Sequence, residues 1–127
     1  PGGMTMTQRS RVALSIGAAL LTTVAVLSAH MKLTKTVPAS GETLTAKPAA
    51  VQLTFNEKPN AAVSRISLSG AAGDVKLGSV HTTDEKTIVA DVTGAMGDGD
   101  YSIKWQSAGD DGHVQKGEIP FSLRSTK

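Results

Sequence analysis

The segment Tyr101-Ser102-Ile103-Lys104-Trp105 (residues 101–105) carries three large apolar residues at alternate positions, with Ser and Lys between them. Because successive side chains of a β-strand point to opposite faces, this segment is predicted to be a strand with one apolar face. The same alternation predicts strands at residues 51–55, 66–68, 88–92 and 119–123. Turn-forming Gly, Pro, Asn and Asp lie between them, at residues 38–41, 58–60, 70–74, 94–100 and 109–112. The pattern predicts an all-β fold, either a β-sandwich or a barrel.

The predicted strands also supply a hydrophobic core. Its expected members are Leu33, Val51, Leu53, Phe55, Ile66, Leu68, Ile88, Val92, Tyr101, Ile103, Trp105, Ile119, Phe121 and Leu123. Full burial of such a side chain contributes about 1.5–3 kcal/mol before conformational entropy is subtracted. A core of this size is adequate for a small sandwich.

Residues 4–29 differ in composition from the rest of the chain. Two basic residues, Arg9 and Arg11, precede an uncharged apolar stretch that ends in small residues at Ser28 and Ala29. This layout is typical of a secretory signal peptide, so we expect cleavage after Ala29. The alternative is an uncleaved membrane anchor, although the apolar run is shorter than the roughly 20 residues that a span requires.

Cleavage would leave residues 30–127 as one neutral mature domain. The whole chain of 127 residues has 13 Lys and Arg against 11 Asp and Glu, and the predicted signal peptide holds two of the arginines. A neutral domain is not expected to bind nucleic acid or anionic lipid through bulk charge. We also expect that the mature protein does not insert into the membrane and is a monomer. The chain has no Cys, which excludes disulfides, thiolate metal sites and a thiol nucleophile. Residues 1–3 precede the first Met and fit no signal pattern.

His30 would become the N-terminal residue of the mature chain. Its α-amine and its imidazole Nδ1 can then chelate one metal ion, and two nitrogens of this kind suit Cu(II), which prefers tetragonal N and O ligands. The α-amine has a reference pKa near 7.7–8.0, so its proton is lost at little cost near neutral pH. The alternative interpretation is a solvated, frayed terminus.

The sequence Asp111-Gly112-His113 places a carboxylate and an imidazole two positions apart. Such side chains can point the same way from an extended segment, and Gly112 allows the loop to bend so that both converge on one ion. With His30 they would form a set of three nitrogens and one oxygen. The alternative is an ordinary polar turn.

Other candidate ligands are weaker. Glu57 follows a predicted strand and is either an acid close to the metal site or a solvated carboxylate, of which the second is favoured. His81 lies in a predicted polar turn and is expected at the surface. Met31 and Met96 are too few and too separated for a thioether Cu(I) site. The motifs of nucleotide-binding proteins, serine hydrolases and zinc proteases are absent, so no enzyme activity is predicted.

The order of these motifs resembles the CopC family of periplasmic copper-binding proteins of bacterial copper resistance and homeostasis. The matching segments are Ala29-His30-Met31-Lys32-Leu33, Val37-Pro38-Ala39-Ser40-Gly41, residues 51–57, residues 101–105 and Asp111-Gly112-His113, with Gly117 and Phe121. The resemblance covers essentially all of residues 30–127. It implies a seven-stranded Greek-key sandwich or barrel, related to cupredoxins and immunoglobulin-like domains, in the periplasm.

The resemblance also implies one Cu(II) ion bound by His30, Asp111 and His113, with Glu57 at an acidic position near the site. Family members often work beside a CopD-type inner-membrane protein. Some carry a Met-rich loop that binds Cu(I), but this chain has no Met cluster, so it is similar to the Cu(II)-only type.

Three hypotheses about function follow. The leading one is a soluble periplasmic protein that buffers or delivers Cu(II). The second is an oxidative copper enzyme similar to the polysaccharide monooxygenases, whose metal arrangement also uses an N-terminal His and a second His. The small number of aromatic residues disfavours it. The third is a metal-free immunoglobulin-like structural module.

Overall fold

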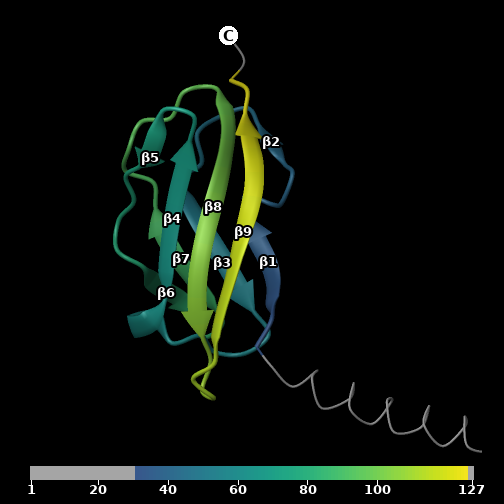
Figure 1. Cartoon of the computed structure of the whole chain (residues 1–127), viewed down its shortest axis with the longest axis vertical. Helices are drawn as coiled ribbons and strands as arrows, with labels where there is room; N and C mark the ends of the chain where they lie inside the picture. The colour runs from purple at the N-terminus through teal and green to yellow at the C-terminus, as the bar shows by residue number, and fades with distance from the viewer. Residues whose placement is uncertain (1–30, 126–127) are drawn as a thin grey trace, which may run out of the picture. The chain divides into compact units, whose positions relative to one another are not determined.

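The computed structural model describes residues 31–125, so the predicted signal peptide and His30 lie outside the described residues. The described part holds nine strands and one short 3-10 turn, and the strands form two sheets. Figure 1 shows the five-stranded sheet in front of the four-stranded sheet. The prediction of an all-β sandwich is confirmed. Within residues 31–125 no helix is long and apolar enough to cross a membrane.

The four-stranded sheet is antiparallel throughout and has the order β1-β3-β7-β6. Its strands are β1 (Leu33–Val37), β3 (Ala50–Phe55), β7 (Thr87–Asp91) and β6 (His81–Asp84). Residues 87–90 of β7 are buried at four consecutive positions. The alternation expected for residues 88–92, with Val89 on the face away from the core, therefore understates the burial of this strand.

The five-stranded sheet has the order β2-β9-β8-β4-β5. Its strands are β2 (Thr43–Leu44), β9 (Val114–Leu123), β8 (Gly99–Ala108), β4 (Arg65–Gly70) and β5 (Gly73–Val75). Only β2 runs parallel to its neighbour; the other pairs are antiparallel. The longest pair, β8 and β9, forms a hairpin in register over ten residues of each strand. Its connecting loop, residues 109–113, therefore projects from one end of the sandwich (Figure 1).

The core lies between the two sheets. Of the fourteen expected core residues, ten are buried. The other four, Leu33, Ile66, Tyr101 and Trp105, are half-buried and packed against the core. Phe55 and Trp105 join the sheets through an edge-to-face contact with ring centroids 5.4 Å apart. Trp105 lies over its cross-strand partner Gly117, where a Cβ would come within 2.7 Å of the indole Cε2. A glycine at this position thus leaves room for the single Trp.

Two local expectations need correction. His81 is in the strand β6 and not in a turn, since residues 81–84 pair with β7, although the side chain is exposed as expected. The structure has nine strands where the resemblance implies seven, and the two shortest, β2 and β5, have two and three residues. Such short segments carry no detectable alternation, because a period of two needs at least four residues to be recognised.

Asp100, at the start of β8, is expected to titrate below its ordinary pKa. The Ser122 hydroxyl donates to Asp100 Oδ1 at 2.8 Å and the Arg124 guanidinium donates to the same atom at 3.0 Å, so the carboxylate is stabilised and its pKa is lowered from 3.8. The stability from this carboxylate is present above pH 3.8 and is lost as the pH falls through the lower folded value. An NMR titration should show this low pKa, and Ser122→Ala should raise it. An unshifted pKa in both proteins would contradict the assignment.

Candidate metal centre

The loop between β8 and β9 brings the Asp111 carboxylate and the His113 imidazole together. The His113 amide donates to Asp111 Oδ1 at 3.0 Å, and His113 Nδ1 lies 3.3 Å from Asp111 Oδ2. Gly112 has a φ of 76°, a left-handed conformation that favours glycine, and its amide donates to the Gly109 carbonyl at 3.1 Å. The side chains of His113 and Asp111 are 67% and 39% exposed. An ion can therefore reach both of them from solvent.

Glu57 lies against the base of the same loop. It follows the end of β3 and is half-buried. A Cβ added to Gly109 would collide with Glu57 Oε1 and would lie 3.5 Å from the Met31 Cβ. The absence of a side chain at Gly109 therefore lets three segments meet: the residues after β3, the β8–β9 loop and the start of the described chain.

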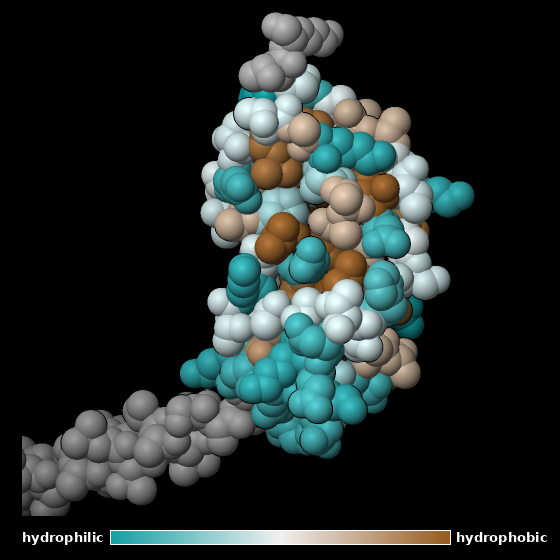
Figure 2. Space-filling model, turned by 180° about the vertical axis from the view of Figure 1, so that it is seen from behind, coloured by the Kyte–Doolittle hydropathy of each residue, from teal (hydrophilic) through white to brown (hydrophobic). Residues whose placement is uncertain are grey.

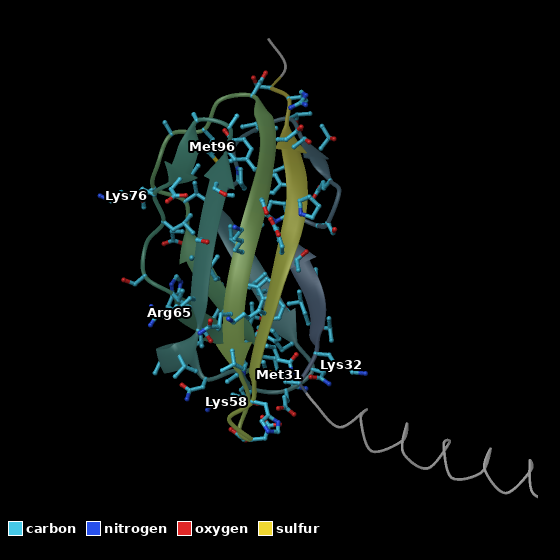
Figure 3. All side chains as sticks on the ribbon, in the orientation of Figure 1. Met31, Lys32, Lys58, Arg65, Lys76 and Met96 are labelled. Atoms are coloured by element: carbon cyan, nitrogen blue, oxygen red, sulfur yellow. The ribbon has the colours of Figure 1, made fainter. Side chains whose placement is uncertain are left out.

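The start of the described chain is held in place at this end. The Met31 side chain is 2% exposed and belongs to the core. The Lys32 amide donates to Asn56 Oδ1 at 2.8 Å, and the Asn56 amide donates to the Lys32 carbonyl at 2.9 Å. Figure 3 shows Met31, Lys32 and Lys58 gathered around the end from which the loop projects. Figure 2, from behind, shows that hydrophilic residues dominate this end.

The remaining predicted candidates lie elsewhere or outside the described range. His30 precedes Met31 and is outside the described residues, so the set of His30, Asp111 and His113 stays a prediction. His81 Nδ1 lies 3.2 Å from the Ser79 carbonyl, in an edge strand of the four-stranded sheet. Within residues 31–125 no three His, Cys, Asp or Glu side chains are close enough to hold a metal ion together. The loop supplies two donors, with Glu57 at its base.

Sequence reasoning missed three residues that shape this end: Met31 as a core residue, Asn56 and Gly109. Met31 lies outside the predicted strands, and its burial depends on packing between distant strands. Asn56 and Gly109 could have been noticed in the sequence, because each directly follows a strand that ends at this end of the sandwich. Their partners, Lys32 and Glu57, lie far away along the chain, so neither contact is visible in a local motif.

Comparison with known proteins agrees with this fold. The family model for the CopC domain matches residues 33–124. The chain belongs to the CopC family. Copper resistance protein C of Xanthomonas campestris pv. juglandis is 27% identical over 104 residues, which cover 76% of this chain and 81% of that protein.

Two solved CopC-family structures have the same fold. CopC from Methylosinus trichosporium OB3b superposes with a TM-score of 0.68 at 24% identity, covering 77% of this chain and 97% of that one. PcoC from Escherichia coli, described as a methionine-rich copper resistance protein, has a TM-score of 0.67 at 25% identity, covering 76% and 100%. The present CopC-family chain has only four Met, and of the two in the described range Met31 is buried and Met96 half-buried.

Proposed function

We propose that this CopC-family protein binds one Cu(II) ion in the periplasm and buffers or delivers it. The proposed ligands are the α-amine and imidazole of His30, the Asp111 carboxylate and the His113 imidazole, with Glu57 beside them. The observation that carries the proposal is the convergence of Asp111 and His113, 3.3 Å apart, in an exposed loop. The copper resistance proteins among its relatives support copper as the metal.

The donor atoms suit Cu(II) because nitrogen and carboxylate oxygen are the ligands that this ion prefers in tetragonal geometry. The approach of Asp111 Oδ2 to His113 Nδ1 favours the tautomer with its proton on Nδ1 and its lone pair on Nε2. Each carboxylate oxygen keeps a further lone pair with which it can bind an ion. The chain has no Cys and no Met cluster, so it lacks the soft sulfur ligands that select Cu(I).

The anchoring of residues 31 and 32 supports His30 as the third contributor. Met31 directly follows His30 in the sequence and packs beside Gly109, at the base of the loop that carries the other two ligands. Because consecutive Cα atoms are 3.8 Å apart, the proposed chelating residue is tied covalently to this neighbourhood. Cleavage after Ala29 is part of the proposal, since only then is the His30 amine a ligand.

The proposed role is binding and transfer, not catalysis. The candidate ligands Asp111 and His113 lie in an exposed loop, which suits an ion that must be exchanged. We propose a monomer that passes copper to or from a CopD-type inner-membrane protein.

A Cu(II) titration of the protein purified after export tests the proposal. Mass spectrometry first establishes whether His30 is the N-terminal residue. We expect one equivalent of Cu(II) to quench Trp105 fluorescence, and the EPR spectrum to show a tetragonal centre with nitrogen ligands. The variant His81→Ala is the matched control, because His81 is an exposed His on β6, and it should bind as the parent does. A stoichiometry far from one, or no binding at micromolar copper, would refute the proposal.

A further inference from the structure

The outer face of the five-stranded sheet carries an open groove with a volume of about 940 Å³. Its floor is the middle of β4, β8 and β9, which no other layer covers in Figure 1. Ala61, in the 3-10 turn at residues 61–63, lines the groove next to the foot of β4. The side chains that alternate with the core residues of these strands are Arg65, Ser67, Lys104, Gln106, Lys116 and Glu118, and all six line the groove. We call this set the basic groove.

Three of the groove residues are cations set close together by strand register. Arg65 and Lys116 lie on either side of Gln106, in the same cross-strand row. Neighbouring strands are about 4.8 Å apart, so the backbones of Arg65 and Lys116, on the two strands that flank β8, are about 10 Å apart. Lys104 lies one row further along β8 and is a diagonal neighbour of both, at about 7–8 Å. The three positive charges therefore form a compact triangle.

These cations form no ion pairs within the described range. Arg65, Lys104 and Lys116 are all exposed. Glu118 is opposite Lys104, but its carboxylate accepts a hydrogen bond from the Ser102 hydroxyl at 2.6 Å. The groove thus has an excess of two positive charges on a domain whose predicted mature form is neutral.

We infer that the basic groove is a docking surface for an extended acidic segment of a partner protein. Alternate side chains of an extended chain are about 6.7 Å apart, close to the diagonal spacing of the three cations, so acidic residues at alternate positions can face them. The groove is hollow, which suits a protruding segment and not a flat bilayer. Its cations are exposed and not enclosed, which disfavours a small anion as the specific ligand.

The basic groove lies next to the proposed copper site, so docking would bring the partner close to the candidate ligands; this step rests on the proposed function. The strands β8 and β9 run from the groove directly into the loop at residues 109–113, and Lys116 is three positions after His113. A partner segment in the basic groove therefore lies beside the candidate ligands. The docking itself requires no copper, and its test is made without added copper so that the two proposals fail separately.

The test uses NMR spectra of the ¹⁵N-labelled protein and a short capped peptide that alternates glutamate and threonine. We expect saturable shifts of amides in the middle of β4, β8 and β9, which weaken as salt rises from about 0.02 to 0.2 M. Lys104→Glu should lower the affinity about tenfold. Lys76→Glu is the matched control, because Lys76 is exposed, does not line the groove and projects from the edge of the domain next to β5 in Figure 3. It should bind the peptide as the parent does.

Four outcomes would overturn the inference. The first is equal peptide affinity in the parent and Lys104→Glu, and the second is an equal loss in Lys76→Glu. The third is binding to vesicles of phosphatidylglycerol and phosphatidylcholine without binding to the peptide, which would assign the surface to a membrane. The fourth is free glutarate that shifts the same amides as strongly at equal carboxylate concentration, which would assign it to a small anion.

Discussion

Replacing His113 by Ala is expected to lower the Cu(II) affinity of the mature protein by at least about a hundredfold. Substituting a residue that only supports a metal ligand typically costs 10–100-fold in affinity, and removing a ligand itself should cost at least as much. The side chain at this position is 67% exposed, so the change should leave the fold intact. A competitive titration against a chelator of known affinity measures the loss.

Two further variants serve as comparisons for this prediction, one in the same loop and one in the other sheet. Asp111→Asn keeps the shape of the side chain but removes the charge, and a smaller loss than that of His113→Ala is expected. His81→Ala should have no effect, because His81 lies on β6 in the other sheet. Circular dichroism and thermal unfolding check that each variant is folded. Unchanged copper affinity in a folded His113→Ala protein would remove the loop from the site.

Adding one Gly before His30 in the mature protein is expected to weaken Cu(II) binding by about a hundredfold or more. The extension converts the α-amine of His30 into a peptide nitrogen, whose proton is far harder to remove than that of an amine with a pKa of about 7.7–8.0. One chelate ring is lost, while the His30 imidazole, Asp111 and His113 remain. The titration is the same as for His113→Ala, and EPR should report one nitrogen ligand fewer.

A Gly added after Lys127 is the matched control for chain extension and should bind copper as the parent does. If the N-terminal extension leaves the affinity unchanged while His113→Ala abolishes it, the amine is not a ligand and the loop still is. If both extended proteins bind equally and His113→Ala also binds normally, the proposed ligand set is wrong. The two experiments therefore separate the two halves of the proposed site.

The fold could be predicted to the extent that one face of each strand is buried. Residues 51–55 and 101–105 alternate because their strands have one face on the core. The expected apolar side chains of two paired strands do pack inward: Tyr101, Ile103 and Trp105 from β8, and Ile119 and Phe121 from β9. The prediction failed for residues 81–84, whose four side chains are all exposed, because a strand without a buried face has no hydrophobic pattern. It also missed the burial of Val89, which is 4% exposed although it lies on the face of β7 away from the core.

The candidate site divides in the same way. Asp111 and His113 are two positions apart around a glycine, so their approach is a local property that the sequence alone predicts. The contact of Glu57 with Gly109 joins residues that follow strands of different sheets, β3 and β8, and only the packing of the two sheets brings them together. The basic groove likewise depends on register, since Arg65, Lys104 and Lys116 belong to three strands.

The sequence by itself determined an all-β domain, nitrogen and oxygen as the metal donors on offer, and the pairing of Asp111 with His113. Those features depend on residue type and on neighbours within a few positions. Only the tertiary structure decided that Met31 is buried, that Gly109 must lack a side chain beside Glu57, and that Gly117 makes room for Trp105. The first two features are contacts between segments distant in the chain and depend on how the two sheets pack. The third depends on the register of the β8–β9 hairpin, which pairs Trp105 with Gly117.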